Sequence, residues 1–397
     1  MSGKPRVLVA NPALRPIGGG NLVAAWVLQA LREDFEVSLG TLEPVDFAQV
    51  NRNFGTDLQA EDCKVEVAPR FYQTVLQNMP TRGALFEICT TMRWAQNLDR
   101  QNRYDVLFST TNEFDFHRRG IQYVHYPWLY LPRPEVELGW YHRLPGTLRL
   151  YRAACMRVAR LTREGLRRNL ILANSEFVAG RVESAQVNGA RVVFPPVVGD
   201  WPDTPWAQRR LGIAAVGRIH TGKRWDMAVD IVERVRQRGH DLTLTLIGHS
   251  DMAEYGQRLD AMAATRPWFR VLRDVDRHRL VAEISANRYG IHAMEEEHFG
   301  IAPAELQRGG CITFVHNSGG QVEIVGRDRR LTFEGIEDAA AKIATVIENP
   351  ALEHELVGEL RERRDWFSAA RFCESIREVV EEFLGRPAPA VARRQTA

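Results

Sequence analysis

The chain has 397 residues, of which 45% are hydrophobic and 26% charged, as is typical of a folded protein with two or three domains. Its 52 basic and 50 acidic residues nearly cancel, which argues against a protein whose main task is to coat nucleic acid. The start, MSGKPRVLVANP, is too polar for a signal peptide, and no run of eighteen apolar residues predicts a membrane span. The cysteines form no CxxC pair, which argues against a disulfide framework or structural zinc and favours a reducing cytoplasm; they are Cys63, Cys89, Cys155, Cys311 and Cys373.

Short β-branched runs alternate with longer helical patterns along the chain. This alternation predicts βαβ units, parallel sheets and an α/β fold. The runs are nearly continuously apolar, as expected of strands covered on both faces. The expected strands are 6–12, 35–41, 104–110, 121–127, 170–175 and 191–197, then 212–219, 242–249, 269–275, 289–294 and 311–317.

The alternation restarts after a segment rich in proline and tryptophan, residues 194–212, which we interpret as a linker between two similar domains. We predict an N-terminal domain at 1–198 and a C-terminal domain at 205–367. A helix at about 368–385 is expected to pack back on the first domain. The Pro/Ala-rich segment 386–397 is expected to be a disordered tail.

Two segments have the residue types that bind phosphate. GRIHTGK places Arg218 and Lys223 directly after an expected strand, where two cations and flexible glycines suit a diphosphate; the alternative is ordinary surface charge in a loop. Gly18–Gly20 lie between the first strand and a strong helical run, as in a phosphate-binding turn. This turn is neither GxGxxG nor a Walker loop, which weakens dinucleotide and ATPase interpretations.

The stretch EEEHFGIAPAELQRGG predicts a turn followed by a helix from Gly300, with Pro303 in its first turn. Glu297 is expected at the mouth of the helix and Glu305 inside it. Carboxylates at one helix end suit the hydroxyl pairs of a sugar and a ribose. The alternative, that acidic residues complement the helix dipole, explains Glu295–Glu297 but not Glu305.

These motifs occur together in one order: the glycine loop, ANSEF (173–177), FPPV (194–197), GRIHTGK (217–223), LIG (246–248), EHFGIAPAELQRGG and NSGGQVEIV (317–325). In this order the chain resembles glycosyltransferases of family 4 from about residue 6 to 384. The most specific element is the E-x7-E motif, Glu297 and Glu305. The resemblance implies a GT-B fold, with two Rossmann-like domains whose parallel sheets face each other across a cleft.

The resemblance also implies a retaining sugar transfer from a nucleotide diphosphate donor, with an N-terminal acceptor-binding domain and a C-terminal nucleotide-sugar-binding domain. Arg218 and Lys223 would hold the diphosphate, Glu305 the ribose and Glu297 the donor sugar. His125, in YVHYP, would match the family histidine that reaches into the cleft. The remaining donor-binding residues implied are Gly19, Gly20, Gly248, Phe299, Gly300, Ile301 and Ala302.

No cofactor or metal is expected, because protein cations and amide dipoles can stabilise the departing phosphate. The stretch DVD, Asp274–Asp276, mimics the metal-binding motif of the other major glycosyltransferase fold. Such short matches arise often by chance, and this one falls where family 4 proteins have a loop near the base. We therefore assign it no metal.

Locally, IHAMEEEHFGI, YVHYP and HNSGGQ look most like α-1,2-mannosyltransferases that extend lipid-linked oligosaccharides, which use GDP-mannose. This favours mannose as the donor sugar and a glycan or lipid-linked acceptor. A UDP-sugar (glucose, GlcNAc or galactose) is the main alternative. No nucleic-acid partner is expected.

One segment of the N-terminal half bears on the acceptor. Residues 148–170 hold seven arginines against one glutamate, with an apolar stripe of Leu150, Ala154, Val158 and Leu161. A basic amphipathic helix can lie on an anionic membrane, and an ordinary domain helix with a solvated basic face is the competing interpretation. The expected location is the cytoplasm, with a peripheral contact to the inner membrane face left open.

Three other classes compete with a glycosyltransferase. A GT-B enzyme such as a nucleotide-sugar epimerase would lack the E-x7-E context. A non-catalytic GT-B partner subunit would be expected to have lost some of Arg218, Lys223, Glu297 or His125, and all are present. A nicotinamide oxidoreductase is disfavoured because no GxGxxG follows the first strand.

Overall fold

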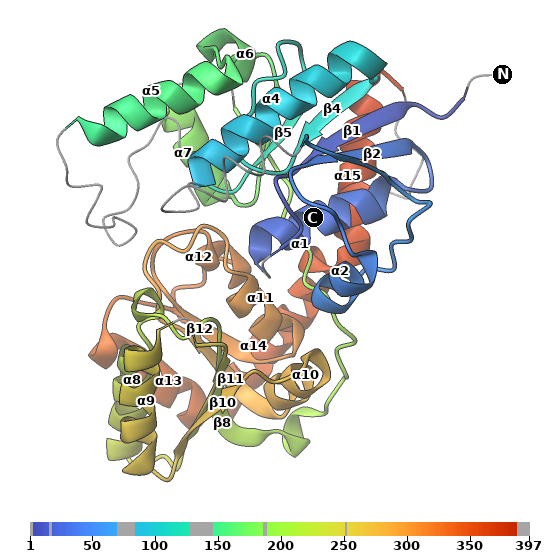
Figure 1. Cartoon of the computed structure of the whole chain (residues 1–397). Helices are drawn as coiled ribbons and strands as arrows, with labels where there is room; N and C mark the ends of the chain where they lie inside the picture. The colour runs from blue at the N-terminus through green and yellow to red at the C-terminus, as the bar shows by residue number, and fades with distance from the viewer. Residues whose placement is uncertain are drawn as a thin grey trace. The chain divides into compact units, whose positions relative to one another are not determined.

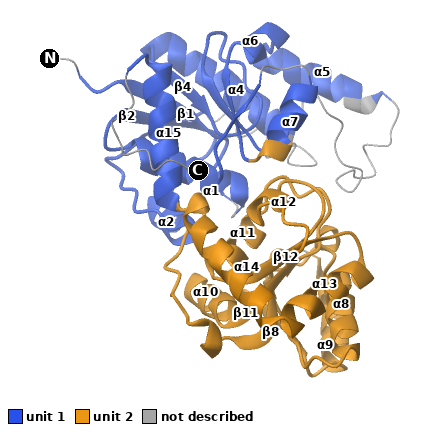
Figure 2. Cartoon of the chain, turned by 180° about the vertical axis from the view of Figure 1, so that it is seen from behind, with its two compact units in different colours: residues 1–174, 178–196, 369–397 blue, residues 175–177, 197–368 orange. Residues whose placement is uncertain are grey.

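The computed structural model of the chain describes residues 3–15, 18–69, 84–127, 146–185, 189–250 and 252–386. The chain divides into two compact units, each built on a parallel sheet (Figures 1 and 2). Unit 1 comprises residues 1–174, 178–196 and 369–397, and unit 2 comprises residues 175–177 and 197–368. The predicted domain boundary, between 198 and 205, lies close to this division. Apart from Arg386, the predicted tail lies outside the described residues.

The sheet of unit 1 has the order β3-β2-β1-β4-β5-β6-β7, and its pairings are parallel. Strand β3 was not expected, because KVEV is short and half polar. The strands are β1 (Arg6–Ala10), β2 (Glu36–Thr41), β3 (Lys64–Val67), β4 (Val106–Ser109), β5 (Ile121–Val124), β6 (Leu170–Ala173) and β7 (Arg191–Val192). The helices are α1 (Gly19–Leu31), α2 (Phe47–Phe54), α4 (Ala84–Asn102), α5 (Thr147–Ala159), α6 (Arg163–Arg167), α7 (Glu176–Ser184) and α15 (Ala369–Phe383).

Helices cover both faces of this sheet because side chains alternate along each buried strand. Leu8 of β1 shares a core cluster with Met92 and Leu98 of α4. On another strand, the ring of Tyr123 lies 6.5 Å from that of Phe372 on α15. Helix α15 also lies beside α1 (Figure 1). The last helix of the chain therefore completes unit 1, as the helix predicted at about 368–385 would.

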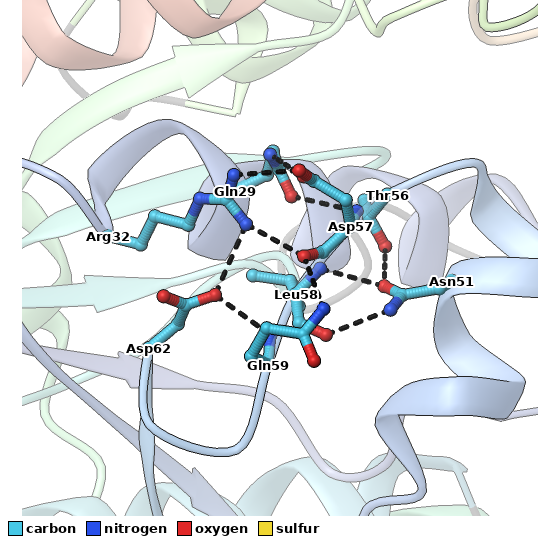
Figure 3. Close-up of polar contacts among 8 residues, drawn as sticks. All are labelled: Gln29, Arg32, Asn51, Thr56, Asp57, Leu58, Gln59 and Asp62. Atoms are coloured by element: carbon cyan, nitrogen blue, oxygen red, sulfur yellow. Dashed lines mark hydrogen bonds and ion pairs between the residues drawn. The ribbon is translucent and has the colours of Figure 1, made fainter.

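A polar network holds the loop that joins α2 to β3 (Figure 3). Arg32 of α1 donates to Asp57 at 2.9 Å and to Asp62 at 3.2 Å. Asn51 of α2 donates to the carbonyl of Leu58 at 2.8 Å and accepts from its N–H at 2.9 Å. The hydrogen bond from Arg32 lowers the pKa of Asp57. The network therefore fixes the approach of the chain to the edge strand.

The sheet of unit 2 has the order β10-β9-β8-β11-β12-β13, and its pairings are parallel. Its short edge strand β13 was not expected from the sequence. The strands are β8 (Arg210–Val216), β9 (Thr243–Gly248), β10 (Phe269–Arg273), β11 (Asn287–His292), β12 (Ile312–His316) and β13 (Thr332–Phe333). The helices are α8 (Trp225–Gln237), α9 (Ala253–Ala264), α10 (Arg277–Ser285), α11 (Ile301–Arg308), α12 (Gln321–Ile324), α13 (Ile336–Glu348) and α14 (Pro350–Arg363), with 3-10 turns η3 (Trp206–Gln208), η4 (Thr221–Lys223) and η5 (Arg364–Phe367).

Neighbouring side chains of β8 point to opposite faces of the sheet, and different helices cover the two faces. Ile213 belongs to the core cluster that contains Trp225 of α8, whereas its neighbour Ala214 belongs to the cluster with Ile284 of α10 and Leu306 of α11. The chain leaves β8 toward β9 on one side and later returns to β11 on the other. The carboxyl ends of β8 and β11 therefore form the topological switch point, where open α/β sheets bind ligands.

The prediction of one long helix over 148–170 is wrong. Helix α5 ends at Ala159, Arg160 has the left-handed φ of 49°, and α6 begins after Thr162. The buried carboxylate of Asp115 causes the break, because it accepts from both the N–H and the hydroxyl of Thr162 at 2.8 Å. No described helix is both long and apolar enough to cross a membrane. All five cysteines are buried free thiols.

Candidate functional site

The turn after β8 carries Arg218 and Lys223 and depends on glycine. Gly217 has φ of 145°, and a Cβ on Gly248 would lie 1.9 Å from the carbonyl oxygen of Gly217. The two backbones can therefore approach only because residue 248 has no side chain, and the positive φ at position 217 also favours glycine. The exposed Arg218 is followed by η4, and its carbonyl accepts a hydrogen bond from Trp225 Nε1 at 3.0 Å.

The loop after β11 carries Glu297 and is held by the NSGG turn. Gly320 N–H donates to the carbonyl of Glu297 at 2.7 Å, and Glu296 N–H donates to Ser318 Oγ at 2.8 Å. A Cβ on Gly319 would lie 2.3 Å from the same Glu297 carbonyl, and Gly319 has φ of 72°. The glycine pair is thus required for the close approach of two backbones, which fixes Glu297 at the end of the strand.

The two turns bring Lys223 and Glu297 together. Lys223 Nζ donates to Glu297 Oε2 at 2.5 Å, and His292 Nε2 donates to the same oxygen at 3.2 Å. The side chains of Lys223 and Glu297 are 17% and 18% exposed. Burial alone would raise the pKa of Glu297, but the Lys223 ammonium and the His292 hydrogen bond hold that pKa well below its usual range. Burial lowers the pKa of His292, so this imidazole is neutral at pH 7.

The other two glutamates of the run have different surroundings. Glu295 is exposed and forms an ion pair with Arg224, and its Oε1 lies 3.6 Å from His316 Nε2. Glu296 is exposed and has φ of 49°. Glu295 is thus paired with Arg224, directly after η4. We had expected it only to complement the dipole of the following helix.

Helix α11 begins after Gly300, as predicted, with Pro303 in its first turn. Gly300 has φ of 104°, and Phe299 is buried with its ring 5.6 Å from that of Phe367. Because first-turn N–H groups have no intrahelical partner, those of Ile301 and Ala302 are available to a ligand. Glu305, on the second turn, forms an ion pair with Arg277 at the start of α10.

In unit 1, His125 and Gly20 lie side by side. A Cβ on Gly20 would be 3.6 Å from His125 Nε2, an ordinary van der Waals distance, so the imidazole lies against the start of α1. His125 Nε2 donates to the carbonyl of Thr110 at 3.0 Å, and its N–H donates to Asn112 Oδ1 at 2.7 Å.

Several residues of the site were missed from the sequence. His292 stands in the expected strand 289–294, five positions before Glu297, and a polar residue at a strand end was the available signal. Arg277 gave no signal, because only the fold brings α10 to α11. Ser318 and Arg224 lie beside residues that were singled out, yet nothing in their spacing indicated these contacts.

The aspartates of DVD have local roles. Asp276 caps α10 by accepting from Arg279 N–H at 2.7 Å, and Asp274 pairs with His249. Among the described residues, no group of three or more histidines, cysteines or acidic residues could hold a metal. Whether the reaction needs a metal is not decided by this geometry and stays a prediction.

Comparison with protein families and curated proteins gives a match to the family model that lies within unit 2. The family model of glycosyl transferases group 1 matches residues 202–363. A curated relative, the Mus musculus "GDP-Man:Man(3)GlcNAc(2)-PP-Dol alpha-1,2-mannosyltransferase", is 24% identical over 170 residues, which are 38% of this chain and 35% of that protein. The chain thus matches about a third of the length of that relative.

The solved structures extend the likeness to both units. Anabaena HepE in complex with UDP and glucose has a TM-score of 0.63 at 15% identity, covering 95% of this chain and 100% of that one. A Rickettsia africae glycosyltransferase has a TM-score of 0.65 at 14% identity, covering 97% and 100%. The sucrose-phosphate synthase of Thermosynechococcus elongatus has a TM-score of 0.65 at 14% identity, covering 96% and 100%.

These findings confirm the resemblance and the fold. Residues 202–363 match the family model of glycosyl transferases group 1, and the chain has the α/β architecture of GT-B glycosyltransferases, with two parallel sheets. The structural likenesses establish the fold alone.

Proposed function

We propose that the chain transfers a sugar from a nucleotide diphosphate donor to a hydroxyl group, with retention of configuration at the anomeric carbon. The observation that carries this proposal is the Lys223–Glu297 pair at the switch point of a group 1 glycosyltransferase segment. Its ammonium and its carboxylate come from the two strand ends where a nucleotide-sugar is expected.

The chemistry of glycosyl transfer fits these groups. Negative charge develops on the departing diphosphate while the sugar becomes oxocarbenium-like. Lys223 has three donors and gives one to Glu297, so the others remain for phosphate oxygens, with Arg218 nearby in sequence. The low pKa of Glu297 keeps it an anion that can accept sugar hydroxyls. The amides of Ile301 and Ala302 supply further donors without a metal.

For the donor sugar we propose mannose from GDP-mannose. The support is the local likeness of IHAMEEEHFGI, YVHYP and HNSGGQ to α-1,2-mannosyltransferases and the mannosyltransferase similarity over 170 residues. A UDP-sugar is the second candidate, and the specific observation in its favour is the fold shared with HepE, whose structures contain UDP and UDP-glucose. The acceptor is proposed to be a glycan or a lipid-linked saccharide, met by unit 1 with His125 contributing to the transfer.

A peripheral membrane contact through α5 is part of this proposal. Leu150 is 75% exposed and Val158 is 36% exposed. The exposed Arg149 and Arg157 lie on the same helix. An apolar strip flanked by arginines suits the surface of an anionic membrane and would bring the enzyme to a lipid-linked acceptor.

The deciding experiment incubates the full chain with a panel of GDP- and UDP-sugars and measures nucleotide release with and without added acceptors. We expect the largest release from GDP-mannose and an α-linked product from the α-linked donor. Lys223→Ala serves as the inactive control. No release from any donor, together with no binding of GDP or UDP, would remove the proposal; an inverted product would remove only the retaining mechanism.

A further inference from the structure

A second polar site lies in unit 2, at the opposite end of the sheet from Lys223 and Glu297. A small cavity of about 30 Å³ is lined by Arg209, Gln307, Gly310, Arg361 and Arg364, among others. Arg209 immediately precedes β8, and Gly310 lies just before β12, so the cavity stands at the amino ends of the strands. The site proposed above stands at their carboxyl ends.

Arg209 is a buried cation with no carboxylate partner in the described part of the chain. The residue is 7% exposed, and its guanidinium donates to the carbonyls of Thr204 at 3.2 Å and Asn287 at 3.1 Å. Among the described residues, no carboxylate oxygen lies within ion-pair distance of it. Glu353 on α14 accepts from Trp206 Nε1 at 2.8 Å and from the hydroxyl of Tyr289. The Trp206 ring also lies 5.9 Å from the guanidinium carbon of Arg209, but carbonyls and a ring do not neutralise a buried charge, which is costly.

Two more arginines increase the positive charge at this cavity. Arg364 donates to backbone carbonyls of Trp201 and Arg308, and its only described carboxylate contact is Asp203 at 3.5 Å. Asp203 is 83% exposed, so water screens this contact. The exposed Arg361 has no ion pair within the described part of the chain. The cavity lining therefore holds the guanidinium groups of Arg209, Arg361 and Arg364 against one carboxylate, that of Asp203, whose ion pair is weak.

The buried amide of Gln307 lacks hydrogen-bond partners among the described residues. The residue is 1% exposed, and neither its amide nitrogen nor its amide oxygen has a hydrogen-bond partner among the described residues. Buried amides are nearly always hydrogen-bonded, and an unmade bond costs about 1–3 kcal/mol. A water molecule could satisfy the amide, but it could not balance the arginines.

We propose that this cavity binds the oxygens of a phosphate group. Guanidinium groups recognise phosphate through paired N–H donors, and the Gln307 amide nitrogen adds a neutral donor. The volume admits about two water-sized atoms, which is enough for the leading oxygens of a phosphate and too little for a sugar ring. The exposed side, at Arg361, leaves room for the rest of a phosphomonoester.

Binding there would join three segments that are distant in sequence. Asp203 and Arg209 flank η3, Gln307 lies near the end of α11, and Arg361 and Arg364 lie at the junction of α14 and η5. Helix α11 also carries Glu305 and begins at the Glu297 loop. A bound phosphate would therefore stabilise the helix that the proposed donor site uses.

The test titrates inorganic phosphate into the full chain and follows binding by calorimetry and by unfolding temperature. All proteins carry Arg218→Met and Lys223→Met, so that phosphate at the proposed donor site does not contribute. We expect saturable binding that weakens at least tenfold in Arg361→Ala and in Gln307→Leu. Arg329→Ala is the matched control, since Arg329 is also an exposed arginine of unit 2, and it should bind as the parent does.

Gln307→Leu separates a binding role from a structural one. It removes two unpaired polar atoms at nearly constant size, so the unfolding temperature without phosphate should stay or rise, while the phosphate-induced rise should fall. Equal phosphate affinity in all variants, or no binding by the parent at millimolar phosphate, would overturn the proposal. Vesicles of phosphatidylcholine with and without phosphatidic acid distinguish a lipid headgroup from a soluble phosphate as the natural source.

Discussion

Arg277 and Glu305 form an ion pair between the first residue of α10 and the second turn of α11. Arg277 also donates to the carbonyl of Val198, and its guanidinium lies 5.3 Å from the ring centre of Trp201. Glu305 is only 11% exposed, so its carboxylate orientation is set by this cation. The glutamate that the family resemblance assigns to the ribose is therefore held in position by Arg277, which no sequence pattern singled out.

The first prediction concerns this pair and the nucleotide. Glu305→Ala should weaken binding of free GDP or UDP by roughly 10–150-fold, because a hydrogen bond to a charged group contributes about 1.5–3 kcal/mol. Arg277→Leu should weaken it less, since the carboxylate remains and loses only its orientation. Calorimetry with both nucleotides measures the order. An Arg277 variant weaker than the Glu305 variant would mean that the arginine itself contacts the nucleotide.

The second prediction concerns the cations after β8. Lys223→Ala and Arg218→Ala should each lower turnover by about 10²–10³-fold, corresponding to about 2–4 kcal/mol of transition-state stabilisation. Glu297→Ala should lower kcat while leaving the affinity for free nucleotide nearly unchanged. Glu295→Ala and Glu296→Ala are the matched controls from the same acidic run, with effects under about tenfold. Steady-state kinetics beside nucleotide calorimetry tests all five variants, and wild-type rates in both cation variants would contradict the assignment.

The third prediction follows from the low pKa of Glu297. A carboxylate whose folded pKa lies below its usual value of 4.5 stabilises the folded state above that value and loses this contribution as the pH falls toward the folded pKa. Glu297→Gln should therefore be less stable than the wild type at pH 7, where Lys223 loses its partner. The difference should shrink as the pH falls below 4.5. Thermal unfolding from pH 7 to 3 measures this, and a difference that grows on acidification would contradict it.

Much of unit 2 could be predicted because each local signal has a local cause. The apolar runs form the expected strands, and EHFGIAPAE forms the turn and helix that its glycine and proline indicate. Glu297 and Lys223 follow strands that are neighbours of one switch point, so parallel-sheet topology alone brings them close. Their low exposure and the His292 contact could not be predicted, since they depend on how three strand ends pack.

The failed helix prediction shows the limit of periodicity. Residues 148–170 have helical spacing throughout, yet the buried Asp115, which is more than thirty positions earlier in the chain, ends α5 by binding Thr162. Strand β3 was missed for a related reason, because KVEV is stabilised by pairing with β2 rather than by its own hydrophobicity. Contacts distant in sequence decided both cases.

The fourth prediction concerns metal. Because the proposed clamp on the diphosphate consists of protein cations and amides, activity should survive excess EDTA. The matched variant is Asp274→Asn, which alters the DVD stretch at its exposed end without removing the α10 cap, and it should keep wild-type rates. Loss of activity in EDTA with rescue by Mg²⁺ or Mn²⁺ would instead contradict the prediction and reopen the metal interpretation of DVD.

The last prediction concerns the exposed face of α5. Leu150 and Val158 present an apolar strip to solvent, with Arg149 and Arg157 on the same helix. If this face docks on anionic lipid, Arg149→Gln with Arg157→Gln should weaken vesicle binding by about 1 kcal/mol per charge, or roughly thirtyfold for the pair. Leu150→Ser should weaken it further, because the apolar contact is independent of salt whereas the arginine contribution declines as salt screens it. The control is Arg163→Gln on α6 with Arg168→Gln directly after it, which removes the same charge beyond the break at Arg160. Cosedimentation with anionic vesicles at low and high salt tests all variants. Equal losses in the α5 and α6 pairs would show that net charge alone drives binding, and no binding by the wild type at low salt would remove the membrane contact.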